Sequence, residues 1–146
     1  MAARTPGART AGLETHPDLR EMRARYDVAA ERTVAQIVNG LIMLTGLYLA
    51  ISPWVVGFRG RTDLAVNNLI TGIALTILGA GLAAAFARTH GLTWVVPVIG
   101  IWTIIAPWVI YGSAVTRSMI WNNVVTGVVT VLFGAAAMAA MALRRK

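Results

Sequence analysis

The sequence predicts an all-α, polytopic membrane protein with four transmembrane helices, arranged as two tandem helical hairpins of the same orientation and preceded by a short N-terminal amphipathic helix. Its 146 residues are 57% hydrophobic, with a mean hydropathy of +0.66, which is too apolar for an ordinary soluble domain. Four segments, residues 33–58, 64–87, 91–116 and 118–143, carry no charge, and each exceeds the length of about 20 residues that a membrane-spanning helix needs. A soluble helix bundle is excluded because its helices would need a polar stripe, and residues 69–86 have no polar side chain except threonine.

The N-terminal part is expected to lie outside the membrane. Residues 1–16 have no apolar period and are predicted to be a disordered cytoplasmic tail. Residues 17–33 are predicted to form the amphipathic helix, because Pro17 suits the first helical position and Asp18 favours the first turn. This helix is expected to lie on the membrane surface, cap the bundle or bind a partner.

A motif that occurs twice divides the membrane region into two repeats, residues 34–88 and 89–146. The first copy reads SPWVVG and then VNNLITG, and the second reads APWVIYG and then WNNVVTG. The proline-tryptophan pairs are 54 residues apart and the asparagine pairs 55 apart, a register specific enough to indicate an internal duplication. The motif residues are Ser52, Pro53, Trp54, Asn67 and Asn68 in the first copy and Ala106, Pro107, Trp108, Asn122 and Asn123 in the second.

Each repeat is predicted to contain two spans, at about 34–56 and 64–87 and at about 92–111 and 119–143. Two spans are an even number, so both repeats must have the same orientation, with a pseudo-two-fold axis along the membrane normal. Small residues recur at helical spacing on the second span of each repeat and predict close helix contact. They include Gly72 and Gly79 in the first repeat and Gly127 and Gly134 in the second.

The basic residues predict the orientation in the membrane. With a cytoplasmic N terminus, ten of the thirteen Lys and Arg residues lie on the cytoplasmic side, and Arg59, Arg61 and Arg117 lie on the other. The excess predicts cytoplasmic N and C termini. Twelve of the thirteen basic residues are Arg, which with the abundant Ala, Gly and Val is typical of a GC-rich bacterial genome.

Two interpretations of the motif residues are open. In the structural one, Pro53 and Pro107 free the carbonyls of Leu49 and Thr103, and an asparagine of the same repeat donates to the carbonyls at this point of the helix. The expected acceptor is the carbonyl of Leu49 or Ala50 in the first repeat and that of Thr103 or Ile104 in the second. In the functional one, the two copies form a polar pocket near the outer face that binds an ion, a lipid headgroup or a quinone-like molecule.

The residues predict no catalytic, cofactor or metal site and no enzymatic activity. The spans contain no Asp, Glu, Lys, Arg or His, so acid-base catalysis and proton-coupled transport would lack a titrating group. The chain has no cysteine, and His16 and His90 cannot complete a metal site by themselves. Nucleic acid is not an expected partner despite the net charge of +7, because the basic residues flank the spans.

The motif copies, SPWVVGF with NNLITG and APWVIYG with NNVVTG, resemble the SPW-repeat bacterial membrane proteins over about Val34 to Leu143. In that family the Ser-Pro-Trp motif lies in the first of two transmembrane helices of each repeat. The stretch HPDLREMRARYDVAAE also looks like the N-terminal extension of some two-repeat members. The second copy departs from the pattern, with Ala106 in place of serine. The resemblance implies a topology and a location in the bacterial cell (inner) membrane, but no established biochemical activity.

We therefore expect a structural or protein-interaction module whose partners are the lipid bilayer and either another membrane protein or a second copy of the chain. The alternative is a small transporter, channel or ligand sensor that uses the outer polar layer. A conducting protein needs a continuous polar path, whereas the inner halves of the spans offer only Gln36, Asn39 and scattered threonines.

Overall fold

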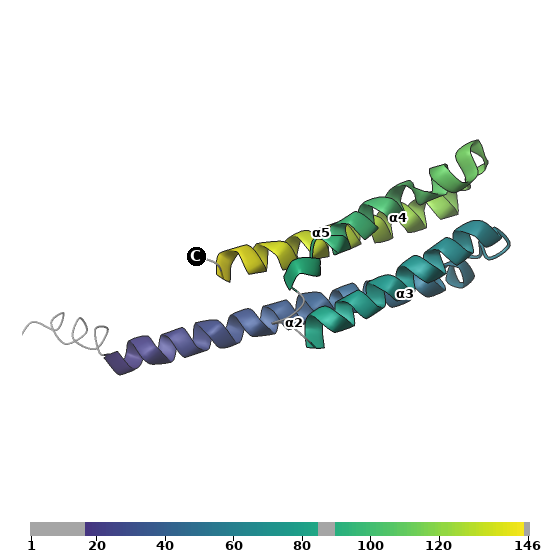
Figure 1. The fold of residues 1–146 in the computed structure, drawn as a ribbon. Coiled ribbons are helices and arrows are strands. Elements are labelled where there is room, and N and C mark those ends of the chain that lie inside the picture. The colour runs from purple at the N-terminus through teal and green to yellow at the C-terminus, as the bar shows by residue number, and fades with distance from the viewer. Residues whose placement is uncertain (1–16, 85–89, 145–146) are drawn as a thin grey trace, which may run out of the picture. The chain divides into compact units, whose positions relative to one another are not determined.

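The computed structural model describes residues 17–84 and 90–144, and its regular elements there are all helices (Figure 1). The predicted tail at 1–16 and residues 85–89 of the predicted turn between the repeats lie outside the described residues. The chain divides into two compact units, residues 1–34 and 35–146. Four helices are long and apolar enough to cross a membrane, so the predicted fold class is confirmed.

Helix α2 (Pro17–Val55) contains both the predicted amphipathic helix and the first predicted span. It begins at the predicted proline. The residues from Ala30 to Gln36 include neither glycine nor proline, so nothing in that stretch ends a helix, and the two predicted helices form one element. In the first unit, Arg25 Nη2 lies 2.6 Å from Glu21 Oε1, an exposed pair that contributes little to stability.

The second unit contains the rest of α2 and three more long helices. These are α3 (Thr62–Ala84), α4 (Val95–Tyr111) and α5 (Arg117–Arg144). The short 3-10 helices η1 (His90–Leu92) and η2 (Gly112–Ala114) precede α4 and α5. In Figure 1, α2 pairs with α3 and α4 pairs with α5, which gives two helical hairpins. The predicted spans match these helices to within a few residues.

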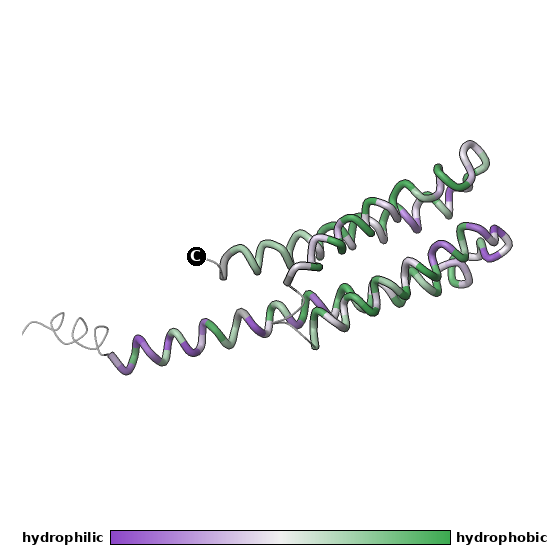
Figure 2. Tube along the Cα trace, viewed as in Figure 1, coloured by the Kyte–Doolittle hydropathy of each residue, from purple (hydrophilic) through white to green (hydrophobic). Residues whose placement is uncertain are grey.

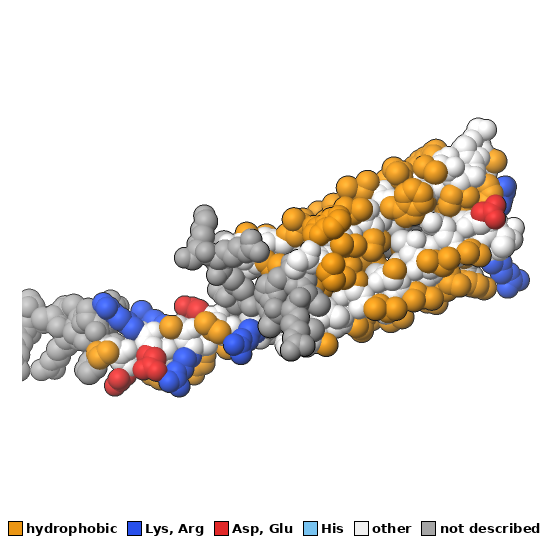
Figure 3. All heavy atoms as spheres, in the orientation of Figure 1, with side chains coloured by type: hydrophobic (Ala, Val, Ile, Leu, Met, Phe, Trp, Pro, Cys, Tyr) orange, Lys and Arg blue, Asp and Glu red, His pale blue; other side chains and the backbone are white. Residues whose placement is uncertain are grey.

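The second unit buries polar side chains beside its apolar core and exposes an apolar surface. Asn68 and Asn123 are completely buried, whereas Ile77 and Leu132 are 66% and 61% exposed. Figure 2 shows apolar residues along all four helices, and Figure 3 shows apolar side chains over the visible face, with charged ones gathered at one end of this unit. Such a surface suits hydrocarbon as the surrounding solvent, because water would penalise its exposed apolar area.

Glycines allow the two helices of each hairpin to touch. A Cβ atom added at Gly72 would lie 2.6 Å from the carbonyl oxygen of Gly46, and one added at Gly127 would lie 2.7 Å from that of Gly100. Real Cβ atoms do not approach so closely, so the contacts confirm the predicted small-residue faces. The glycines of this kind are Gly46, Gly72 and Gly79 in the first hairpin and Gly100, Gly127 and Gly134 in the second.

Two apolar clusters fill the interior of the second unit, and both take residues from the two hairpins. The turn-end cluster, near the α2–α3 and α4–α5 turns, contains Phe58, Leu64, Ala106 and Met119. The distal cluster, toward the opposite end, contains Ile42, Leu75, Leu82, Val96 and Ala137. Burial of these side chains therefore holds the hairpins together at both ends.

Candidate functional site

A network of side-chain hydrogen bonds lies between the two apolar clusters and joins the hairpins. We call it the asparagine network, and its members are Tyr48, Ser52, Asn67, Asn68, Trp102, Asn122 and Asn123. Asn68 and Asn123 each follow the first residue of their helix by six positions, about 9 Å along the helix axis. The network thus lies within the apolar part of the helices.

Asn68 and Asn123 form the centre of the network. Nδ2 of Asn68 donates to Oδ1 of Asn123 at 2.9 Å, and Nδ2 of Asn123 donates to Oδ1 of Asn68 at 3.3 Å. This reciprocal pair satisfies a donor and an acceptor on each buried amide. It also brings equivalent positions of the two motif copies face to face, which is the arrangement expected next to a two-fold axis.

An aromatic residue of each hairpin donates to the first asparagine of the other hairpin. The Tyr48 hydroxyl donates to Oδ1 of Asn122 at 3.0 Å, and Nε1 of Trp102 donates to Oδ1 of Asn67 at 3.0 Å. Tyr48 and Trp102 are 54 residues apart, the same spacing as the Pro-Trp pairs. The network therefore makes equivalent contacts across the α2–α5 and α3–α4 sides of the bundle.

Ser52 supplies a hydrogen bond to the Leu49 carbonyl, which Pro53 leaves without a backbone donor. Its Oγ donates to the carbonyl oxygen of Leu49 at 2.8 Å, and it accepts from Nδ2 of Asn122 at 3.0 Å and from Nδ2 of Asn68 at 3.4 Å. The prediction that an asparagine donates to the Leu49 carbonyl is wrong. The serine lies on the same helix, three residues further on, and reaches that carbonyl first, while the asparagines pair with one another.

The second motif copy lacks this arrangement. Pro107 frees the carbonyl of Thr103, but Ala106 has no hydroxyl to donate, and no side chain among the described residues bonds to that carbonyl. The prediction that an asparagine serves it is also wrong. Asn67 donates to Oδ1 of Asn68 at 3.3 Å, as Asn122 does to Oδ1 of Asn123 at 3.1 Å, but it makes no bond to a serine like that of Asn122 to Ser52.

The motif prolines face inward and the motif tryptophans face outward. Pro53 and Pro107 are buried, whereas Trp54 and Trp108 are exposed on the bundle surface. Neither proline ends its helix at once, since α2 and α4 continue for a few more residues. An exposed tryptophan near a helix end suits the membrane–water interface, so these two rings contact the surroundings and not the network.

The chemistry of the network is that of neutral hydrogen bonding. It contains amides, hydroxyls and an indole, and no carboxylate, amine, guanidinium or imidazole. Each of its four amides both donates and accepts inside the network. Among the described residues, no group of three His, Cys, Asp or Glu side chains could hold a metal ion. A closed set of such bonds can hold helices together.

Sequence reasoning found the serine and the asparagines but missed three residues. Tyr48 and Trp102 could have been found by comparing the two copies position by position, because their spacing matches that of the prolines. Thr126 is the threonine of NNVVTG, and its hydroxyl lines an open groove beside the network. The sequence carries no signal for this groove.

Four long apolar helices with buried amides between them define a multi-pass membrane protein. The family described as SPW repeat domain matches residues 36–137, which include both motif copies and the whole asparagine network. The chain therefore belongs to the SPW repeat family, a membrane protein family of unknown biochemical role. Searches of curated proteins and of solved structures found no match.

Proposed function

We propose that the chain is a structural or protein-interaction module of the bacterial inner membrane, without enzymatic activity, built from two duplicated hairpins. The closed asparagine network is the observation that carries this proposal. Its amides satisfy one another across the hairpins, whereas a solute path needs polar groups that are free to replace the solute's hydration. The charge distribution supports cytoplasmic N and C termini.

Flux measurements test the absence of a conducting path. Purified protein in liposomes should give K⁺ and proton fluxes equal to those of empty vesicles, in the parent and in the Asn68→Leu variant alike. A protein-dependent flux that the Asn68→Leu variant abolishes would make the network part of a pathway and would overturn the proposal.

Site-specific photo-crosslinking in cells tests the interaction role. A photoreactive residue at the outward-facing positions Ile77 or Leu132 should give a discrete protein adduct, either with a second copy or with one defined membrane protein. The same residue at Leu75, which is buried in the distal cluster, is the matched control and should give no intermolecular adduct. Adducts with lipid alone at all outward positions would contradict a protein-interaction role.

Cysteine labelling tests the orientation and is clean because the chain has no cysteine of its own. An impermeant thiol reagent added to intact cells should label Gly60→Cys and Ala114→Cys in the turns. It should leave Arg20→Cys unlabelled. The reverse pattern would place the termini outside.

The second candidate function is the ligand sensor. One observation favours it over a transporter or channel: the open groove between α2 and α5 beside the network.

A further inference from the structure

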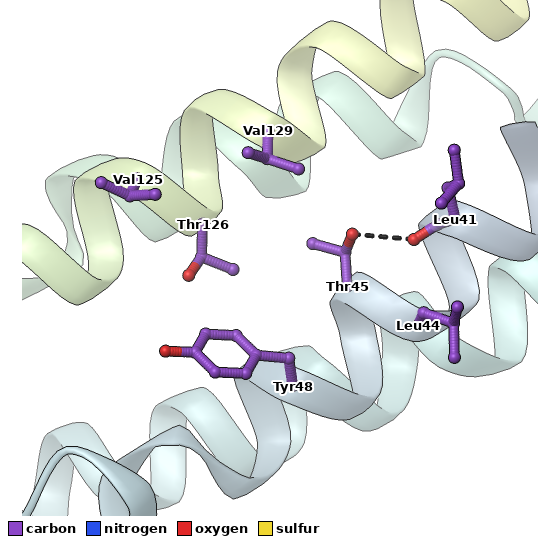
Figure 4. A pocket seen from close by; sticks show the side chains of 7 residues that line it. All are labelled: Leu41, Leu44, Thr45, Tyr48, Val125, Thr126 and Val129. Atoms are coloured by element: carbon purple, nitrogen blue, oxygen red, sulfur yellow. Dashed lines mark hydrogen bonds between the residues drawn. The ribbon is translucent and has the colours of Figure 1, made fainter.

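A groove opens along the side of the second unit between α2 and α5. It consists of two hollows of about 270 and 410 Å³, and Tyr48, Val125 and Thr126 line both. Figure 4 shows the first hollow, with side chains of α2 and α5 facing each other across it. The rest of its lining is mainly apolar, with Leu41 and Leu44 on α2. Volumes of this order suit a small lipophilic molecule.

Thr126 lines this groove with a hydroxyl that has no hydrogen-bond partner. The residue is only 4% exposed, and in the described part of the chain nothing bonds to its Oγ1. In Figure 4 the hydroxyl projects into the space beside the Tyr48 ring. Thr45, Thr103 and Thr130 each donate to the carbonyl four residues earlier, at 2.7 to 2.8 Å. Thr71, the equivalent of Thr126 in the first motif copy, also has no hydrogen bond to its hydroxyl among the described residues, but it is only half-buried. A buried polar group left unpaired is costly and calls for an explanation.

The Thr126 hydroxyl indicates which polar group an occupant of the groove should carry. The Tyr48 hydroxyl hydrogen already points to Asn122, and the Thr45 hydroxyl already donates to the Leu41 carbonyl. Thr126 is left as a buried hydroxyl that is free to donate on an apolar wall, and an occupant with a hydrogen-bond acceptor on a mainly apolar body would satisfy it. Trp121 lines the second hollow and is well exposed, and it adds an aromatic face near the polar end.

The depth of Thr126 distinguishes between lipid-soluble acceptors. It lies nine residues after Arg117, the first residue of α5, which is about 14 Å along the helix axis. Since the hydrocarbon core is about 30 Å thick, Thr126 lies near the middle of the bilayer when α5 spans it. The ester carbonyls of a phospholipid lie at the boundary of the core and do not reach this depth. An acceptor for this hydroxyl must therefore be carried inside the hydrocarbon, as the ring carbonyl of a lipid-soluble ketone is.

We propose that the α2–α5 groove binds a lipid-soluble ketone of the isoprenoid quinone class, with one ring carbonyl accepting from the Thr126 hydroxyl. The ring lies against Tyr48 and Val125, and the tail follows the apolar wall formed by Leu41 and Leu44. The structural role proposed above neither requires this site nor depends on it. The step is binding alone, with no electron transfer.

Fluorescence titration tests the site. The parent protein in phosphatidylcholine nanodiscs should show saturable quenching of tryptophan fluorescence by decylubiquinone, and Trp121→Phe should remove most of the saturable component. Thr126→Val, which is nearly isosteric, should weaken binding by about fivefold to tenfold, the loss expected of one hydrogen bond. The matched control is Thr103→Val, a buried threonine on α4 whose hydroxyl is already paired, and it should bind within twofold of the parent.

Each other outcome overturns the proposal. Quenching that rises linearly, as for tryptophan octyl ester in the same nanodiscs, would mean that bulk phospholipid fills the groove. Displacement of the quinone by excess decylbenzene, which has no carbonyl, would mean that the groove recognises only an apolar body. Equal weakening by Thr126→Val and Thr103→Val would mean that the hydroxyl has no specific role.

Stability without ligand gives an independent readout. Because Thr126→Val replaces an unpaired buried hydroxyl by a methyl group, it should raise the unfolding midpoint of the quinone-free protein, whereas Thr103→Val should lower it. A fall in the midpoint of Thr126→Val would show that the hydroxyl already has a structural partner, and the proposal would fail.

Discussion

The two motif copies share a proline, a tryptophan and an asparagine pair, yet they differ in the hydrogen bonding of the carbonyl four residues before the proline. In the first copy, Ser52 donates to the Leu49 carbonyl and accepts from asparagines of both hairpins. In the second copy, Ala106 lies buried in the turn-end cluster, and the Thr103 carbonyl receives no side-chain donor among the described residues. In the first copy, the carbonyl freed by the proline is therefore linked to the asparagine network through Ser52, and the second copy has no such link.

This difference separates two roles within the motif. The asparagines and the aromatic donors make equivalent contacts on both sides of the bundle, so they serve association of the hairpins. The serine replaces the backbone hydrogen bond that proline removes from its own helix, and it also accepts hydrogen bonds from the network. A copy without the serine still folds into a helix, because apolar packing tolerates one carbonyl with a weakened bond near a helix end.

The largest expected effect is at the glycine contacts. Gly72→Ala would push a Cβ against backbone atoms of Gly46 and Ala50 alone. Gly127→Ala would meet a side-chain carbon of Ile104 first and then the Gly100 carbonyl oxygen at 2.7 Å. Overpacking costs about 1–3 kcal/mol, and we expect Gly72→Ala to lie at the upper end because backbone cannot move aside. Unfolding in mixed detergent micelles, followed by circular dichroism, measures the difference.

The matched control for the glycine prediction is Gly81→Ala, where an added Cβ meets nothing within 4 Å. Replacing glycine in a helix interior should then stabilise by about 0.5–1 kcal/mol. Equal effects at Gly72 and Gly81 would contradict close packing of α2 on α3.

The next effect is at the central amide pair. Asn68→Leu and Asn123→Leu each leave a buried amide partly unpaired, and each should cost about 1–2 kcal/mol. The double variant should cost less than the sum, because its second substitution removes the amide that the first left unpaired. Additive costs in the same unfolding assay would show that the two amides do not pair.

A smaller effect distinguishes the two prolines. Ser52→Ala should cost about 1 kcal/mol in the parent and less in a Pro53→Ala background, where the restored backbone N–H can serve the Leu49 carbonyl. Pro107→Ala should be more favourable than Pro53→Ala, since the carbonyl of Thr103 has no side-chain donor to lose. Equal values for the two proline replacements would remove the distinction between the copies.

The smallest expected change in stability comes from giving the second motif copy the serine of the first. Ala106→Ser supplies a hydroxyl that can donate to the Thr103 carbonyl and accept from Asn67, and we expect a gain of about 0.5 kcal/mol. The free energy of unfolding is again the measurement. A loss of more than 1 kcal/mol would mean that the apolar turn-end cluster cannot accept a hydroxyl at this position.

The sequence by itself determined the membrane class, the extents of the four spans and the glycine faces between paired helices. These features depend on local composition and on helical periodicity, which are properties of short segments. The structure joins the predicted N-terminal helix and the first span in one continuous helix, because a change from polar to apolar residues does not end a helix unless a breaking residue accompanies it.

The tertiary structure alone decided which polar groups meet. Asn68 and Asn123 are 55 residues apart, and nothing in either segment states that they face each other. The choice of Ser52 over an asparagine as the donor to Leu49, and the rotamer that leaves the Thr126 hydroxyl free in a groove, depend on the register and spacing of helices from different hairpins. A side chain selects its hydrogen-bond partner by distance and angle in three dimensions, and those are set only when the helices pack.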